Sequence, residues 1–214
     1  MKELLISLVC FSVLACQNGN AISEKNPEAP QKAVQKPVKT DAVAYFASGC
    51  FWCVEAVFES VKGVGEVESG YTGGKEKNPS YELICTGTTR HAEAVKVYYD
   101  SQQVDYETLL TVFFDSHDPS TLNQQGPDKG PQYRSAIFYQ NEAEKKAAQA
   151  YIDRLKASKK YKQVTTQLAP LTVFYKAEEY HQDYEKNHPN NSYVRAVSVP
   201  RIEAFKRKNP ELLK

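Results

Sequence analysis

The chain has 214 residues, of which 41% are apolar and 25% charged, and its formal net charge is +1. This composition is that of a globular protein with one substantial core, so a single folded domain is expected. The Lys and Arg residues are scattered along the sequence and form no basic run. We therefore expect no nucleic-acid partner and favour a small or peptide-like ligand.

The first segment predicts export from the cytoplasm. A short charged start is followed by an apolar run from Leu4 to Ala15, which is too short to span a bilayer and is typical of a signal peptide. The run ends in VLAC (residues 13–16), which resembles a bacterial lipobox. We predict a lipoprotein-type signal over residues 1–15 and a lipid anchor on Cys16, with ordinary cleavage after Ala15 as the alternative. Either reading exports the protein, and the lipid would hold it on a membrane in the periplasm or at the cell surface.

Residues 16–41 predict a flexible tether, and residues 42–214 the folded domain. The tether is polar, contains prolines and has no aromatic side chain. It cannot bury enough apolar surface to offset the entropy of ordering it. The domain retains three cysteines, Cys50, Cys53 and Cys85. Because three is odd, at least one thiol stays free or cycles between redox states.

The first half of the domain predicts strands around one helix. Residues 42–47 form a short apolar run typical of a buried strand, and an apolar stripe over residues 54–61 predicts a helix after Gly49. Cys50 therefore lies where a strand turns into a helix N-terminus. Residues 64–71 predict a second strand, followed by a loop rich in Gly, Pro and Asn.

The second half predicts further interleaved helices and strands. Asp105 caps one expected helix, and Asn141 with Glu144 forms a capping-box-like start to another that runs to Ser158. Strands and helices that interleave through irregular connections predict a compact α/β (α+β) two-layer sandwich. The remaining expected elements are strands over 95–99, 133–139, 164–168 and 171–175, a loop over 118–132 and a polar helix over 177–186.

The sequence GCFWC (residues 49–53) suggests thiol chemistry. A thiol at a helix N-terminus feels unpaired N–H groups and the positive end of the helix dipole, which favour the thiolate on Cys50. The Cys50-x-x-Cys53 spacing is typical of redox dithiols, although a structural disulfide remains an alternative. Phe51 and Trp52 either line a pocket beside the sulfur or pack under the helix. The domain offers no second pair of ligands at suitable spacing, so we expect no metal.

From about Tyr45 to Tyr184 the chain resembles the A-type peptide methionine sulfoxide reductases. The resemblance rests on several motifs in the family's order, which makes a chance match very improbable. The matching segments are GCFWCVE (49–55), SGYTGG (69–74), NPSYE (78–82), CTGTTRHAEAVKVYYD (85–100) and HDPSTLNQQGPDKGPQYRSAIFY (117–139). With this family we expect a ferredoxin-like core with a mixed sheet and long irregular loops.

The resemblance implies specific roles at one site. Cys50 corresponds to the family's nucleophile, and Phe51 and Trp52 to the pocket for the substrate methyl group. The implied substrate is methionine-S-sulfoxide, protein-bound or free, and no cofactor is implied. A sulfoxide accepts thiolate attack at sulfur when its oxygen is protonated, which a buried carboxylic acid with two phenols can support. The residues implied for that group are Glu93, Tyr81 and Tyr133, with Asp128 nearby.

The recycling step is implied less directly. Many members carry resolving cysteines near the C-terminus, but here residues 191–194 stand in that place and no Cys follows. Members with a Cys at the position of Cys53 are the closer match, which implies a Cys50–Cys53 disulfide reduced by a thioredoxin-like donor. Cys85 is the alternative resolving thiol. A generic thiol–disulfide oxidoreductase that uses the same two cysteines is the rival function.

Overall fold

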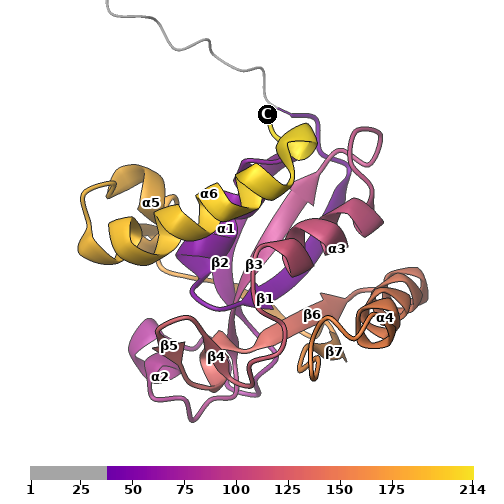
Figure 1. Ribbon diagram of the computed structural model, residues 1–214. Helices are drawn as coiled ribbons and strands as arrows, with labels where there is room; N and C mark the ends of the chain where they lie inside the picture. The colour runs from indigo at the N-terminus through magenta and orange to yellow at the C-terminus, as the bar shows by residue number, and fades with distance from the viewer. Residues whose placement is uncertain (1–37) are drawn as a thin grey trace, which may run out of the picture. The chain divides into compact units, whose positions relative to one another are not determined.

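A six-stranded mixed sheet forms the centre of residues 38–214, the part of the chain that the computed structural model describes (Figure 1). The strands lie in the order β7-β6-β1-β3-β2-β8, and neighbours are antiparallel except β6 and β7, which are parallel. Their bounds are β1 Ala42–Ser48, β2 Val64–Thr72, β3 Ala92–Tyr99, β6 Ser135–Tyr139, β7 Gln167–Pro170 and β8 Phe174–Lys176. The predicted signal peptide, Cys16 and the tether as far as residue 37 lie outside the described residues.

The central strands have the ferredoxin-like arrangement. Strands β6, β1, β3 and β2 are neighbours in that order, and the helices α1 and α3 follow β1 and β3 in the chain. The prediction of an α/β fold with a mixed sheet is therefore confirmed. The helices are α1 Phe51–Glu59, α2 Tyr81–Cys85, α3 Tyr106–Asp115, α4 Glu142–Ala157, α5 Tyr184–Asn187 and α6 Val199–Lys208. Within residues 38–214, none of them is long and apolar enough to cross a membrane.

Two of the helices begin where the sequence predicts. The Asp105 side chain accepts a hydrogen bond from the Thr108 N–H at 2.7 Å, which caps α3. The Asn141 side chain accepts from the Glu144 N–H at 2.9 Å, which caps α4. Such caps satisfy N–H groups that have no partner within the helix, so they are readable from local sequence.

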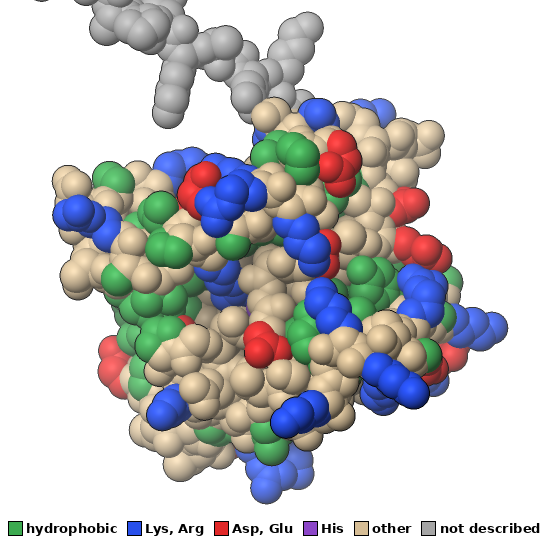
Figure 2. Space-filling model, viewed as in Figure 1, with side chains coloured by type: hydrophobic (Ala, Val, Ile, Leu, Met, Phe, Trp, Pro, Cys, Tyr) green, Lys and Arg blue, Asp and Glu red, His purple; other side chains and the backbone are tan. Residues whose placement is uncertain are grey.

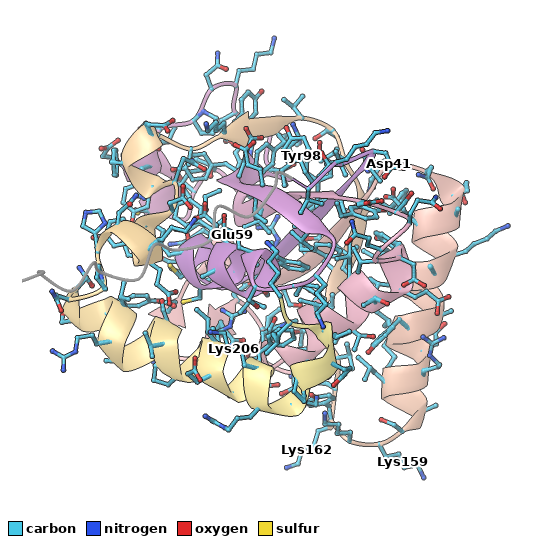
Figure 3. The ribbon with its side chains drawn as sticks, turned by 90° about the horizontal axis from the view of Figure 1, so that it is seen from above. Asp41, Glu59, Tyr98, Lys159, Lys162 and Lys206 are labelled. Carbon is cyan, nitrogen blue, oxygen red and sulfur yellow. The ribbon has the colours of Figure 1, made fainter. Side chains whose placement is uncertain are left out.

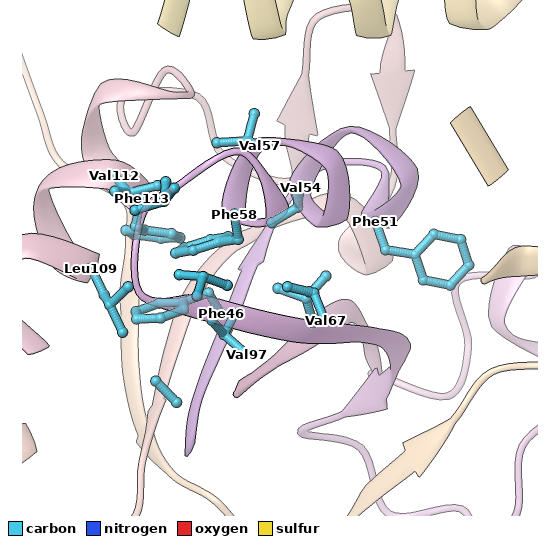
Figure 4. Close-up of a cluster of buried hydrophobic side chains, with 14 of the residues drawn as sticks. Phe46, Phe51, Val54, Val57, Phe58, Val67, Val97, Leu109, Val112 and Phe113 are labelled. Carbon is cyan, nitrogen blue, oxygen red and sulfur yellow. The ribbon is translucent and has the colours of Figure 1, made fainter. Parts of the chain in front are cut away.

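The main hydrophobic core lies between the sheet and α1, α3 and α6. Phe46 of β1 stacks on Phe58 of α1, with ring centroids 5.0 Å apart, and on Phe113 of α3, at 5.3 Å. Figure 4 shows these rings together and Phe51 at the opposite end of α1, pointing away from them. A smaller apolar cluster covers the other face of the sheet, where the Tyr45 ring lies 5.5 Å from that of Phe174. The core end of α1 is thus closed, whereas its N-terminal end faces another environment.

The C-terminal segment runs back across the domain beside α1. Figure 3, seen from above, shows α6 with Lys206 next to the helix that carries Glu59. The chain end is fixed by backbone hydrogen bonds from Lys62 to Leu212 and from Lys214 to Ser60. On the face drawn in Figure 2, Lys and Arg side chains are dispersed among acidic, apolar and uncharged groups.

Several predicted elements differ from the structure. The segment 177–186 is not one helix, because a 3-10 turn at Glu179–His181 and α5 are separated by Asp183, whose φ is +51°. The loop 118–132 contains a two-stranded hairpin, β4 Gln124–Gln125 and β5 Asp128–Lys129.

Three further differences concern the strands near the C-terminal half and the chain end. Tyr133 belongs to a 3-10 turn, Pro131–Tyr133, so the strand predicted to begin there begins at Ser135. The two strands expected over 164–175 are shorter and start later, and they join opposite edges of the sheet as β7 and β8. A π-helical turn, Val194–Ser198, and α6 were not expected from the sequence.

The anchored part of the chain begins just before β1. Asp41, the last residue of the predicted tether, accepts hydrogen bonds from the backbone N–H and the hydroxyl of Ser101, both at 2.8 Å. Its own N–H donates to the carbonyl of Tyr99 at 3.1 Å. These contacts fix the entry of the chain into β1.

Candidate active site

Cys50 lies at the N-cap of α1, as the sequence predicts. Gly49 precedes it with φ +90°, and a Cβ at that position would stand 2.6 Å from the Cβ of Gln125. Glycine therefore permits both the turn and the close approach of the 124–125 strand. Cys50 is buried and its thiol is free, as is that of Cys53, which lies one helical turn further on.

Glu93 joins β3 to the start of α1. Its Oε2 accepts a hydrogen bond from the Phe51 N–H at 3.1 Å, while Oε1 has no hydrogen bond within residues 38–214. The side chain is 1% exposed. Burial raises the pKa of Glu93 to about 8, although the Phe51 N–H opposes the rise. The carboxyl is therefore protonated at neutral pH and can donate a proton.

A cavity of about 330 Å³ brings the predicted residues together. It is lined by Cys50, Phe51, Trp52, Tyr81, Glu93, Asp128, Tyr133, Asn191, Ser192 and Tyr193. Every residue that the family resemblance implies for the nucleophile, the methyl pocket and the oxygen site belongs to this set. The predicted resolving residue, Cys53, does not line it. We call this cavity the substrate pocket.

Aromatic contacts hold Trp52 in a fixed position in the substrate pocket. Its indole Nε1–H donates to His181 Nδ1 at 3.1 Å, and its ring stacks on Tyr184 with centroids 3.7 Å apart and planes 7° apart. The Phe51 ring lies 4.9 Å from that of His181. Because His181 Nδ1 accepts this bond, its ring is the Nε2–H tautomer, and burial lowers its pKa. A neutral, rigid aromatic wall is suited to an apolar methyl group.

The two predicted phenols arrive from separate elements. Tyr81 begins α2, where its N–H donates to Glu178 Oε1 at 2.9 Å, and Tyr133 ends the 3-10 turn Pro131–Tyr133. Within the described chain, neither hydroxyl has a nitrogen or oxygen hydrogen-bond partner. Burial and the nearby charge of Glu93 raise the pKa of both phenols. Both therefore stay protonated and are able to donate to an oxygen atom in the pocket.

Sequence reasoning missed the contribution of the C-terminal segment. Tyr193 donates its hydroxyl to Asp128 Oδ2 at 2.6 Å, which fixes the carboxylate beside the pocket. His181 and Tyr184 hold Trp52 from the same segment. The only available signal was that residues 191–194 stand where the family resemblance implies a resolving cysteine. The contacts themselves join residues more than sixty positions apart, so no local pattern reveals them.

The three thiols have different surroundings. Burial, the adjacent Cys53 and the charge of Glu93 raise the pKa of Cys50 well above its ordinary value. A hydrogen bond from Cys50, with the charge of Arg201 and the Ser198 hydroxyl, lowers the pKa of Cys53 to about 6 despite burial. These surroundings favour the thiolate on Cys53 in the resting pair, whereas the expected effect of the helix N-terminus on Cys50 stays a prediction.

One N–H group at the start of α1 is used by Glu93 and not by the Cys50 thiol. The Phe51 N–H bonds Glu93, and Cys50 makes no capping hydrogen bond. Cys85 is exposed at the end of α2, with its thiol beside the Tyr81 hydroxyl. Among residues 38–214, no group of three or more His, Cys, Asp or Glu side chains is arranged to hold a metal ion.

A family model described as peptide methionine sulfoxide reductase matches residues 42–212. The chain belongs to the peptide methionine sulfoxide reductase family. It is 49% identical over 168 residues to peptide methionine sulfoxide reductase MsrA 1 of Rhodopirellula baltica, across 78% of this chain and 86% of that one. It is 47% identical over 171 residues to the MsrA of Acinetobacter baumannii, across 80% of this chain and 98% of that one. The prediction that the chain is an enzyme of this family is confirmed.

Solved structures of the peptide methionine sulfoxide reductase family share this fold. Reduced Mxr1 from Saccharomyces cerevisiae superposes with a TM-score of 0.65 at 32% identity, covering 71% of this chain and 88% of that chain. Methionine sulfoxide reductase A of Corynebacterium diphtheriae gives a TM-score of 0.64 at 32% identity, covering 73% of this chain and 78% of that chain. The α/β architecture is therefore that of the family.

Proposed function

We propose that the protein reduces methionine-S-sulfoxide, free or within proteins, to methionine through Cys50. The observation that carries the proposal is a buried Glu93 carboxyl in the same aromatic-walled pocket as the Cys50 thiol. Phe51 and Trp52 would accept the methyl group, and the pocket of about 330 Å³ is large enough for a methionine side chain. The selectivity for the S epimer is carried over from the family.

In the first step Cys50 attacks the sulfoxide sulfur. The S–O bond breaks as oxygen passes to Cys50, which becomes a sulfenic acid while methionine leaves as the thioether. The proton that the Cys50 thiol loses passes to Glu93 and replaces the one that Glu93 gives to the oxygen, so the step has no net proton change. Glu93 donates to that oxygen as charge develops, and the hydroxyls of Tyr81 and Tyr133 stabilise the same atom.

In the second step Cys53 attacks the sulfenic acid. A sulfur–sulfur bond forms between Cys50 and Cys53, and the oxygen leaves as water after taking one proton. The low pKa of Cys53, about 6, suits it to this role. A thioredoxin-like dithiol then returns both cysteines to thiols by two exchange steps and is itself oxidised. Asp128, fixed by Tyr193, lies beside both cysteines and supports the site without a covalent role.

A single turnover without reductant tests the two steps separately. Wild type should release one methionine per enzyme and lose two thiols, as read by amino-acid analysis and mass spectrometry. Cys53→Ser should still release one methionine but lose thioredoxin-dependent cycling, and Cys50→Ser should release none. Full cycling by Cys53→Ser would instead assign the resolving role to Cys85 or to direct reduction of the sulfenic acid, which Cys85→Ser distinguishes.

The rival function is a generic thiol–disulfide oxidoreductase that uses Cys50 and Cys53. Such an enzyme needs neither a buried acid nor a methyl pocket, so Glu93→Gln would leave its activity unchanged. The presence of Glu93 and of the Tyr81 and Tyr133 phenols around the pocket favours sulfoxide chemistry.

The proposed location is outside the cytoplasm, on a lipid anchor at Cys16. The support is the apolar run over residues 4–15 followed by VLAC. Palmitate labelling of the expressed protein, with Cys16→Ser as the control, tests it: loss of label and release from the membrane are expected in the variant. Label retained by Cys16→Ser would refute the anchor.

A further inference from the structure

A second cavity reaches the buried side of Cys53. It has a volume of about 240 Å³ and shares only Asp128 with the substrate pocket. We call it the Cys53 cavity, and its remaining lining residues are Cys53, Gln125, Gly126, Pro127, Ala196, Val197 and Arg201. Cys50 and Cys53, one helical turn apart, therefore face different cavities. The guanidinium of Arg201 lines the cavity beside Cys53.

Arg201 is held in a fixed orientation at the start of α6. Its Nε–H donates to the carbonyl of Ser116 at 2.6 Å, and Nη2 donates to the Ser48 hydroxyl at 3.1 Å. Its Nη1 lies 3.5 Å from where a Cβ on Gly49 would stand, and makes no hydrogen bond within residues 38–214. A guanidinium fixed by two bonds loses little further entropy when its remaining N–H groups act on a neighbour.

Hydroxyl groups complete the surroundings of the Cys53 sulfur. The Ser198 Oγ lies 2.8 Å from Cys53 Sγ and is fully buried, and the Tyr193 hydroxyl lies 3.9 Å away. Ser198 ends the π-helical turn that leads into α6, so Ser198 and Arg201 reach Cys53 from one continuous helical segment. The Tyr193 hydroxyl donates its hydrogen to Asp128, so Ser198 is the hydroxyl that can donate to Cys53. A donated hydrogen bond and a nearby cation both favour the thiolate form of a cysteine.

The acidic neighbours of Cys53 oppose this effect only weakly. Glu93 of β3 and Glu185 of α5 have pKa values raised by burial to about 8 and about 7, so much of their charge is absent at neutral pH. Asp128 of β5 is the exception: burial raises its pKa, but the Tyr193 hydroxyl and the charge of Arg201 oppose the rise, so a carboxylate here opposes the effect of Arg201. His117 is buried beside Arg201 and has a pKa lowered to about 3, so it adds no second positive charge.

We infer that Arg201 is a positioning residue for the second half of the catalytic cycle: its fixed guanidinium keeps Cys53 as the thiolate that attacks the Cys50 sulfenic acid. The inference rests on the proposed function. Cys53 supplies the electron pair of the new sulfur–sulfur bond, the Cys50 S–O bond breaks, and the oxygen leaves as water with one added proton. Once Cys50 is a sulfenic acid its thiol hydrogen bond to Cys53 is gone, and Arg201 and Ser198 are the groups left to hold Cys53 as the thiolate.

The first test measures thiolate directly, without sulfoxide. In a Cys85→Ser background only Cys50 and Cys53 remain in the folded domain, and ultraviolet thiolate absorbance against pH gives the first apparent pKa of the pair. Arg201→Gln and Arg201→Met should raise it by about one unit, and Arg201→Lys, which keeps the charge, should stay within about half a unit of wild type. Arg207→Met removes an exposed charge from the same helix and should leave it unchanged. Cys53→Ser should remove the low-pH thiolate, which assigns it.

The second test measures resolution after one turnover. The methionine released per enzyme should be unchanged in Arg201→Gln, whereas the rate of disulfide formation should fall. At a pH well below the pKa of Cys53 in both proteins, a pKa raised by one unit lowers the fraction present as thiolate about tenfold. A thiolate of higher pKa is also a stronger nucleophile, which offsets part of this loss, so the rate of disulfide formation should fall about threefold. As pH rises through the two pKa values the difference should vanish and then reverse, because both proteins become ionised and the more basic thiolate of Arg201→Gln is the stronger nucleophile. A purely structural role would not produce this pH dependence.

The outcomes separate the inference from the proposed function. An unshifted titration in both neutral variants, with circular dichroism and unfolding curves like those of Arg207→Met, would overturn the role of Arg201. An Arg201→Lys protein with the same first apparent pKa as Arg201→Gln would also overturn the role of Arg201. If Arg201→Gln does not fold, Arg201→Met takes its place in this comparison. A shifted titration in a protein that releases no methionine would refute the proposed function and leave the effect of Arg201 on Cys53 standing.

Discussion

At the C-terminal end of α1, Phe58 stacks on Phe46 inside a closed core, whereas at its N-terminal end Phe51 and Trp52 face a pocket that contains the Cys50 thiol. Both ends are rich in large apolar side chains, and both are extensively buried. At the core end, each ring is surrounded by other apolar groups. At the pocket end, the rings lie beside a protonatable carboxyl and two phenols. Residue type alone therefore does not distinguish the hydrophobic core from the substrate pocket. Substitutions at the two ends of α1 should affect different properties of the protein.

The largest effect is expected at the pocket end from Glu93→Gln. Glutamine can still accept from the Phe51 N–H, but it cannot supply a proton to the sulfoxide oxygen. Sulfoxide reduction should fall by roughly 10² to 10⁴, the range typical of a lost general acid. Methionine release under single-turnover conditions measures it, with far-UV circular dichroism as the check on folding. Turnover within a fewfold of wild type would remove Glu93 from the chemistry.

At the core end, Phe58→Ala should act on stability and not on chemistry. Loss of a buried ring that stacks on Phe46 should cost about 3–5 kcal/mol in the free energy of unfolding, measured by urea denaturation. The folded fraction should retain its rate per molecule. Phe51→Ala is the matched change at the other end of the helix and should lower the reduction rate as well. Equal losses of rate per folded molecule in the two variants would show that the ends are not separate.

The charge state of Glu93 gives a pH prediction. Its folded pKa of about 8 lies above the unfolded value, so the folded protein keeps a proton that the unfolded chain has released. Its contribution to stability is therefore fully present below about pH 4.5 and is lost as pH rises towards 8. The free energy of unfolding of wild type minus that of Glu93→Gln should fall with pH across this window, by up to about 1.4 kcal/mol per unit.

Taking the difference between these two proteins cancels the contributions of buried groups that do not interact with Glu93. Glu55 has a pKa of about 7 and contributes in the same direction, whereas the depressed pKa of Cys53 contributes in the opposite direction. Urea unfolding at several pH values measures both proteins. A difference that is flat from pH 5 to 8 would mean that Glu93 is ionised in the folded state, contrary to its assigned role as an acid.

The smallest effect is spectroscopic. Trp52 is the only tryptophan of the chain, so intrinsic indole fluorescence reports on the pocket end of α1 alone. In unreactive Cys50→Ser, methionine sulfoxide should produce a saturable change in emission as a methyl group replaces water against the ring. An equal concentration of alanine serves as the control. The absence of a saturable change would place the substrate away from Trp52.

Local signals in the sequence gave the elements that depend on local forces. The caps at Asp105 and Asn141 and the apolar stripe of α1 were predictable because each involves residues within a few positions. The helix expected over 177–186 does not form as one element because its polar groups make hydrogen bonds to distant parts of the chain. The Gln182 side chain bonds both backbone groups of Ser69 in β2, and the Asp183 N–H donates to Glu55 at 3.0 Å. These bonds to α1 and β2 outweigh the helical preference of the segment.

The sequence by itself determined the family and the identities of the residues proposed for the reaction, because its motifs occur in order and carry the nucleophile, the acid, the phenols and the aromatic wall. Only the tertiary structure decided how those groups are charged and supported. Burial keeps a proton on Glu93, Tyr193 fixes Asp128, and Arg201 on the last long helix lies in the cavity of Cys53. A pKa depends on desolvation and on charges from distant parts of the chain, and these exist only once the chain has folded.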